Sequence, residues 1–168
     1  MKNIVLIILL LLFCSCTQNA KEYTTTILEN GKIDTTFIQN ISESEKALIS
    51  LYLFAYGNEC TDHSATNKCQ LLDLLQIKDE CDKQHIDFLN KWFKKDVLMS
   101  SKLQNCPNLP INFAIQNSIK KLVLSRVVDT LSLTIEVKGI NETQEKTWDT
   151  EQTMSYFIKN DTFIKIHH

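Results

Sequence analysis

Apolar residues recur with a helical period in the first half of the chain. After Ser42 and Glu45, which have the spacing of a capping box, apolar residues follow every three or four positions and predict an amphipathic helix that ends near Gly57. A second, shorter helical stripe runs from Cys69 to Ile77. A third helix capped by Asp79 would place the following residues on one face: Cys81, His85, Phe88, Leu89, Trp92 and Phe93.

The period changes to two after Pro107 and Pro110. Strict alternation of apolar and polar residues from Leu131 to Lys138 predicts a strand with one buried face. Similar patterns predict strands over 120–128, 148–158 and 163–166, with turns at Asp129-Thr130 and Asn160-Asp161 and a polar connection over 139–146. The sequence therefore predicts an α+β fold in which about three N-terminal helices pack on a C-terminal antiparallel meander of about four strands.

The segment from Tyr23 to Phe37 allows two interpretations. Asn30-Gly31 at its centre is the strongest short signal for a two-residue hairpin turn, which would place Glu29 opposite Lys32. The richness in Thr and Asn is equally typical of an extended tether. Both interpretations stay open at this point.

The N-terminus has the pattern of an export signal. Lys2 precedes ten apolar residues, Ile4 to Phe13, a run too short to span a bilayer. The following Cys14-Ser15-Cys16 resembles the lipobox of bacterial lipoproteins, in which the cysteine after a small residue is lipidated. This resemblance implies a signal peptide over 1–15 and a lipidated Cys16. The pattern of elements then predicts a lipidated N-terminus with a tether or hairpin over 16–41 and a single α+β domain over 42–168. A cleaved signal without lipid is the alternative.

A lipid on Cys16 would anchor the protein to a membrane without crossing it, because acyl chains supply the membrane affinity. We therefore expect a protein of the bacterial cell envelope that faces the periplasm.

Four cysteines follow the signal, and an even number in an exported chain predicts two disulfides. We favour Cys60 with Cys69 and Cys81 with Cys106, because both pairs close short loops. The alternative is a zinc site, since Cys60 lies three residues before His63 and Cys81 four residues before His85.

Composition and charge limit the function. The chain has 168 residues, 43% of them hydrophobic, and a net charge of -2, and Arg126 is its single arginine. A net negative charge and a single arginine do not favour a basic surface that binds phosphates, so we expect no nucleic-acid partner. The common nucleotide, hydrolase and zinc-protease motifs are absent, and we expect no cofactor.

If the protein is an enzyme, the best ionisable candidates are His85 and Asp87, with Asp129 or Asp149 as a second carboxylate. His85 falls on the apolar stripe, where a packed core histidine is the simpler interpretation, and Asp87 falls on the wet face.

Two further groups allow a binding role. The aromatic residues Trp92, Phe93 and Trp148 could form a binding patch, although their spacing is more typical of a core. His167 and His168 could bind a metal, although terminal histidines are usually inert.

The order of helices before a meander, closed by the hairpin Tyr156 to Ile166, resembles the NTF2-like (cystatin-like, SnoaL-like) superfamily. The resemblance implies a conical pocket between sheet and helices, used for small ligands, for isomerase or dehydratase chemistry, or for dimerisation. Only three glycines are present, which argues against strongly bent strands and a deep pocket.

Three functional hypotheses follow. The first is a non-enzymatic, lipid-anchored envelope protein that binds another protein or a small ligand. The second is an immunity protein that neutralises a toxin from competing bacteria. The third is a small-molecule isomerase or hydrolase of the NTF2-like kind that uses His85 or an aspartate.

Overall fold

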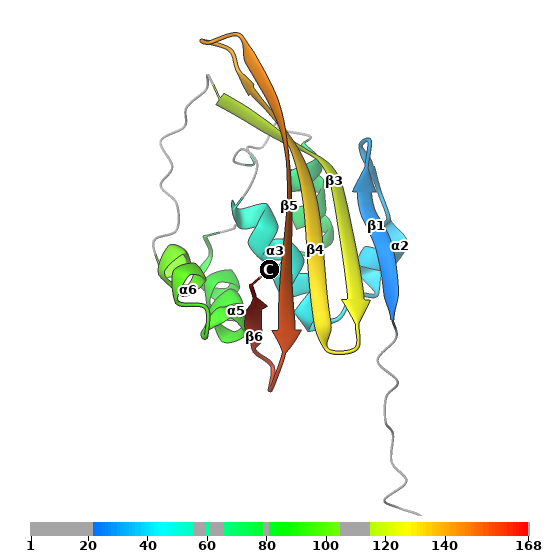
Figure 1. Cartoon of the computed structure of the whole chain (residues 1–168), viewed down its shortest axis with the longest axis vertical. Helices are drawn as coiled ribbons and strands as arrows, with labels where there is room; N and C mark the ends of the chain where they lie inside the picture. Colours follow the sequence, from blue (N-terminus) through cyan, green and yellow to red (C-terminus); the bar gives the residue numbers. More distant parts are fainter. Residues whose placement is uncertain (1–21, 56–59, 61–65, 79–80, 105–114, 168) are drawn as a thin grey trace, which may run out of the picture.

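The computed structural model describes residues 22–55, 60, 66–78, 81–104 and 115–167. Within these residues the chain forms an α+β fold, a six-stranded antiparallel sheet with five helices (Figure 1). The α+β class predicted from the sequence is therefore confirmed. The predicted signal peptide, Cys16 and Asp79 lie outside the described residues, as do His63, Cys106 and His168.

The predicted meander is confirmed as four consecutive strands. They are β3 (Ile115–Val127), β4 (Thr130–Asn141), β5 (Lys146–Ile158) and β6 (Phe163–Ile166), and each pairs antiparallel with the next. Along β4 the apolar side chains from Leu131 to Val137 are buried, while the intervening polar side chains are half-buried. The turn at Asn160-Asp161 is also as predicted, with φ values of 51° and 52°.

The boundaries of the first two strands of the meander differ from the prediction. Val127 pairs with Thr130, so the turn consists of Val128 and Asp129 and not of Asp129-Thr130. β3 and β4 also continue beyond the predicted ends, as far as the pair Ile115 and Asn141. In this extension Gln116 pairs with Ile140 and Asn117 with Gly139. The predicted connection over 139–146 shortens to the turn at 142–145.

The N-terminal segment is a hairpin and not a free tether. β1 (Tyr23–Glu29) pairs with β2 (Lys32–Ile33), and Glu29 faces Lys32 as predicted. Asn30 and Gly31 have φ values of 51° and 77°, which a two-residue hairpin turn of this type requires. β1 also pairs with β3 and joins the main sheet, whose order is β2-β1-β3-β4-β5-β6.

The order of elements therefore needs one correction, because two strands precede all the described helices. The first helix, α2 (Thr35–Gln39), lies where the sequence predicted the end of the hairpin or tether. It begins there because the Asp34 side chain accepts a hydrogen bond from the backbone N–H of Phe37, at 2.9 Å.

The three predicted helices are present as α3 (Glu43–Ala55), α4 (Asn67–Leu74) and α5 (Lys83–Phe93). α3 is not amphipathic as predicted: it is buried on nearly all sides, because it lies between the sheet and the other helices. α5 has the predicted solvent-exposed and buried faces. It begins after Asp82, whose side chain caps the helix by accepting a hydrogen bond from the backbone N–H of Gln84. α6 (Val97–Gln104) has no regular apolar stripe and is not predicted from the sequence.

The disulfide between Cys60 and Cys69 is confirmed, with a Cα–Cα distance of 5.5 Å. Cys81 is also disulfide-bonded, and its pairing with Cys106 stays a prediction. The alternative zinc site needs Cys60 and Cys81 as thiolate ligands, and both are oxidised in disulfides, which removes that alternative. In the part of the chain that the structure describes, no group of three or more His, Cys, Asp or Glu side chains could hold a metal ion.

Candidate functional site

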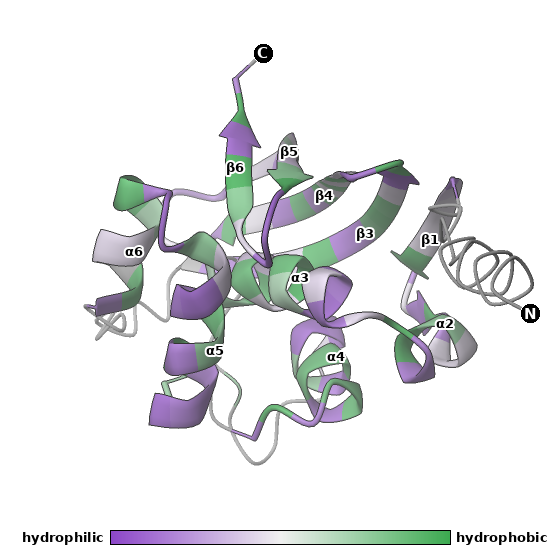
Figure 2. Cartoon of the chain, turned by 90° about the horizontal axis from the view of Figure 1, so that it is seen from below, coloured by the Kyte–Doolittle hydropathy of each residue, from purple (hydrophilic) through white to green (hydrophobic). Residues whose placement is uncertain are grey.

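All the helices of the described residues lie on one face of the sheet. Figure 2, seen from below, shows the described helices on one side of the strands. The covered side contains an aromatic cluster in which Phe93 lies 4.9 Å from Phe163 and 5.4 Å from Tyr156, measured between ring centroids. Trp92 packs on Phe163 at 5.1 Å. Large side chains thus fill this part of the space between sheet and helices, and Trp92 and Phe93 belong to the core.

The centre of the opposite face is polar and is ordered by the strand register. Outward-facing hydroxyl groups meet in pairs between β4 and β5: the Oγ atoms of Ser132 and Ser155 lie 2.8 Å apart, and the Oγ1 atoms of Thr134 and Thr153 lie 2.7 Å apart. Cross-strand hydroxyl pairs of this kind stabilise a sheet and fix side-chain positions. The centre of this face therefore carries rows of hydroxyl groups.

Charged residues follow the hydroxyl rows on the same face. The strand register places the following residues in one row across four strands: Glu29, Lys121, Glu136 and Glu151. Lys121 Nζ lies 2.6 Å from Glu29 Oε1, and this hydrogen bond and charge raise the pKa of Lys121. Both side chains are exposed, so the ion pair contributes little stability and is free to exchange for a ligand.

The charged row borders a shallow depression of about 370 Å³. Its lining consists of residues from four strands and the β1–β2 turn: Glu29, Asn30, Lys120, Lys121, Glu136, Lys138 and Asp149. Both signs of charge are present, so this surface suits a polar partner with charges of its own and does not suit an apolar ligand.

β5 is longer than its outer neighbour. β6 pairs only with Ser155–Ile158, and on the side away from β4 no described strand pairs with Lys146–Met154. The side chains of residues 146–153 are all exposed. An open strand edge presents backbone N–H and C=O groups that another extended chain can pair with.

The direction of these backbone groups follows from the hydrogen bonds at the end of β5. The N–H of Ile158 donates to Asp129 on the β4 side, at 2.7 Å, and the N–H of Lys159 donates to Thr162 on the β6 side, at 2.9 Å. Because the direction alternates along a strand, the N–H groups of Asp149, Glu151 and Thr153 point to the open edge.

Trp148 lies at the far end of β5 and is neither core nor fully exposed. A Cβ atom added to Gly139 would lie 2.0 Å from the Trp148 ring, so the indole rests directly on the β4 backbone. Only a glycine leaves room for this contact. Trp148 is 36% exposed and marks one end of the open edge.

The structure does not assemble the enzymatic site considered from the sequence. His85 is buried on the inner face of α5, while Asp87 is exposed and pairs with Lys83 at 2.7 Å. Asp149 lies on the opposite side of the sheet, and Asp129 lies in the β3–β4 turn. His167 is exposed at the end of the chain.

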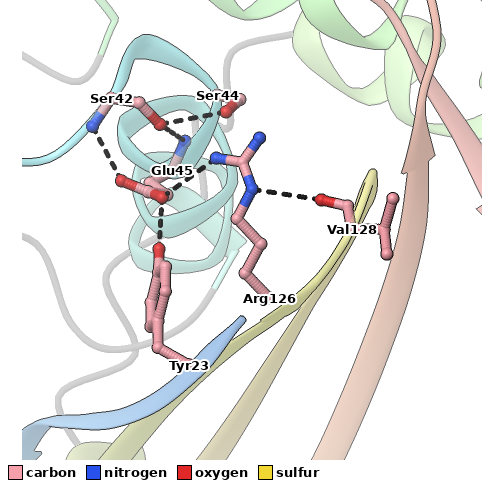
Figure 3. A network of polar contacts seen from close by, with 6 residues as sticks. All are labelled: Tyr23, Ser42, Ser44, Glu45, Arg126 and Val128. Carbon is pink, nitrogen blue, oxygen red and sulfur yellow. Dashed lines mark hydrogen bonds and ion pairs between the residues drawn. The ribbon is translucent and has the colours of Figure 1, made fainter. Parts of the chain in front are cut away.

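A partly buried polar network lies where β1 begins and β3 ends (Figure 3). Glu45 accepts hydrogen bonds from the Tyr23 hydroxyl and from the backbone N–H of Ser42, the latter at 2.7 Å. Arg126 Nη1 lies 3.3 Å from Glu45, and Arg126 Nε donates to the carbonyl of Val128 at 3.3 Å. The network thus ties the starts of β1 and α3 to the end of β3.

The pKa values in this network reflect that structural role. Burial raises the pKa of Tyr23 strongly, and the hydrogen bond to Glu45 adds to the effect. Burial alone would raise the pKa of Glu45, but hydrogen bonds from Tyr23 and Ser42 and the charge of Arg126 outweigh it and lower that pKa. A carboxylate that is ionised and fully bonded in this way anchors structure.

The sequence predicted the Ser42–Glu45 capping box but not the other two partners of Glu45. The signals available were the single arginine of the chain and a tyrosine at a strand start. Neither identifies a partner without the register that places Tyr23 opposite Arg126.

Comparison with family models, curated proteins and solved structures finds no match for the chain. Among the described residues, no helix is both long enough and apolar enough to span a membrane.

Proposed function

We propose that the protein is a lipid-anchored bacterial envelope protein of the non-enzymatic, binding type, which pairs with an extended segment of a partner protein along the edge of β5. The observation that carries this proposal is the outer edge of β5 at Asp149, Glu151 and Thr153, with which no described strand pairs and which adjoins the charged row on the sheet face opposite the described helices. The lipid on Cys16 and the signal over 1–15 rest on the resemblance to the lipobox, and the periplasmic orientation follows from them.

The chemistry of the edge favours one kind of partner segment. The outward-facing Asp149 and Glu151 lie two residues apart on the open edge, with Glu136 beside Glu151 on the next strand. A segment with Lys or Arg at alternate positions would add a strand to β5 and place its charges against these carboxylates. Self-pairing of two β5 edges about Thr150 is disfavoured, because it would place Asp149 opposite Glu151 of the second copy.

An immunity protein against a toxin is the second candidate. The acidic side chains on the open edge favour it, because they suit a basic partner. The NTF2-like resemblance also stays a proposal. The aromatic cluster around Phe93, Tyr156 and Phe163 occupies space that a pocket would need, so we do not favour small-molecule chemistry.

Site-specific photocrosslinking in cells tests the binding site. A photoreactive residue at Glu151 reports on the open edge, and one at exposed Lys83 of α5 is the matched control on the helix side. We expect a discrete protein adduct at 151 that is missing at 83. The substitution Asp149→Pro in the crosslinking chain removes an edge N–H without touching the β4 ladder and should abolish the adduct.

The proposal is wrong if position 151 gives no adduct or gives the same adduct as position 83. It is also wrong if Asp149→Pro leaves the adduct unchanged, because pairing along the edge needs that N–H group.

A further inference from the structure

Exposed apolar residues gather at one end of the sheet. Val127, Phe157 and Ile164 are 57%, 39% and 37% exposed, although each is large and hydrophobic. The register places Val127 opposite Thr130, Thr130 opposite Phe157, and Phe157 opposite Ile164. These four residues, of which all but Thr130 are apolar, form one row across β3 to β6 on the face opposite the described helices. We call this row the apolar row.

The β3–β4 turn extends this row at its tip. Val128 is 51% exposed and has a φ value of 53°, a region that a β-branched residue rarely adopts. A glycine would fit this backbone without strain. Arg126 Nε donates a hydrogen bond to the Val128 carbonyl at 3.3 Å, so the polar network of Figure 3 extends to this turn. An exposed apolar side chain on a strained backbone at a hairpin tip points to a use outside the fold.

The chain enters the domain at this same end. Tyr23 begins β1 and pairs with Arg126, the neighbour of Val127. In Figure 1 the start of β1, the β3–β4 turn and the β5–β6 turn all lie at the lower end, and the β4–β5 turn lies at the upper end. Cys16 precedes Tyr23 by seven residues, which reach at most about 25 Å when fully extended.

We infer that the membrane-facing surface of the protein is the apolar row Val127, Thr130, Phe157 and Ile164 together with Val128, and that it docks on the lipid bilayer in which the Cys16 anchor is embedded. This inference rests on the proposed lipid anchor. The short segment between Cys16 and Tyr23 keeps this end near the lipid, where exposed apolar side chains gain by entering the headgroup and acyl boundary. The β4–β5 turn, and with it the Trp148 end of the open β5 edge, then points away from the membrane.

Quenching of tryptophan fluorescence by lipids with brominated acyl chains tests this orientation. The mature chain, purified from cells, is reconstituted into phosphatidylcholine vesicles with and without bromine. Phe157→Trp is the probe at the apolar row, and Thr143→Trp in the β4–β5 turn is the matched control. Both variants also carry Trp148→Phe, so that buried Trp92 is the one other source of tryptophan fluorescence in each. If Phe157→Trp fails to fold, Ile164→Trp replaces it in the same row.

We expect the probe at 157 to lose much of its emission in brominated vesicles and the probe at 143 to lose none. Equal loss at both positions, or none at 157, overturns the docking surface. Shielding of position 157 from aqueous iodide without bromine quenching also overturns it and assigns the row to a protein contact. The mass of the N-terminal peptide is measured on the same sample: an acylated Cys16 without quenching refutes only this inference, whereas an unmodified Cys16 refutes the proposed anchor itself.

Discussion

The substitution Glu45→Gln tests how the N-terminal end of the sheet is held together. It keeps the size of the side chain and the hydrogen-bonding carbonyl but removes the negative charge. The Glu45 side chain is 7% exposed and that of Arg126 is 22% exposed, so water reaches the arginine but hardly the carboxylate. Breaking a fully buried ion pair costs about 3–5 kcal/mol. Because Arg126 can be partly hydrated after the change, we expect a loss of about 2–3 kcal/mol in the free energy of unfolding.

The stability lost in Glu45→Gln should depend on pH. The pKa of Glu45 is lowered in the folded protein, so its ionised form stabilises the fold at every pH above the value in the unfolded chain, about 4.3. That stability is lost as the pH falls through the lower folded pKa. The difference between the wild type and Glu45→Gln should therefore be largest at pH 7 and should shrink as the pH falls below about 4.

Urea denaturation followed by circular dichroism, at several pH values and with the disulfides intact, measures this difference. The matched control is Glu43→Gln, which removes a carboxylate from the same helical turn at an exposed position. The control should change the free energy of unfolding by less than about 0.5 kcal/mol. A difference for Glu45→Gln that stays constant from pH 7 to pH 3 would refute the assigned role of the charge.

Three further variants test the rest of the fold. Replacing Cys60 and Cys69 by serine opens a nine-residue loop and should lower the free energy of unfolding by about 2–3 kcal/mol in urea denaturation, and an unchanged midpoint would contradict this. Phe93→Ala should cost about 3–5 kcal/mol in the same assay, because the ring packs against two other aromatic rings, and a loss below about 1 kcal/mol would show a loosely packed core. Gly139→Ala should push the Trp148 ring off the β4 backbone, and tryptophan emission should become more accessible to acrylamide; unchanged quenching would show that the contact is absent.

The elements predicted best from the sequence are those whose pattern is local. The alternation from Leu131 to Lys138 defines β4 because one face of that strand packs against helices and the other does not. The α5 stripe is clear for the same reason, and Asn30-Gly31 specifies a turn by its own backbone preference. α3 was predicted as a helix but not as a buried one, because the burial of its second side depends on α4 and α5.

The missing elements lack a local pattern. α6 has the sequence Val97–Gln104 without a regular apolar stripe, and it is fixed by packing and by Asp96, whose side chain accepts from Met99 N–H at 3.1 Å. Asp96 also accepts a hydrogen bond from Tyr156, 60 residues later in the chain, at 3.4 Å. A contact between residues so far apart in the chain cannot be predicted from a single sequence.

The candidate binding surface depends on register in the same way. Glu29, Lys121, Glu136 and Glu151 come from four strands, and nothing in the sequence shows that they form one row. The open edge of β5 exists because β6 is four residues long and β5 is thirteen, which is a property of the pair and not of either strand alone. The His85 and Asp87 hypothesis relied on residue type, and the structure separates these side chains between core and solvent.

The most direct test of the proposed envelope anchor is metabolic labelling of the full chain with radioactive palmitate in a bacterial host. Cys16→Ser and Cys14→Ser form a matched pair, since both remove one thiol from the same short segment. The proposal predicts that the wild type and Cys14→Ser incorporate label into the membrane fraction and that Cys16→Ser incorporates none. Label that persists in Cys16→Ser, or a wild type without label, would contradict a lipid anchor at Cys16.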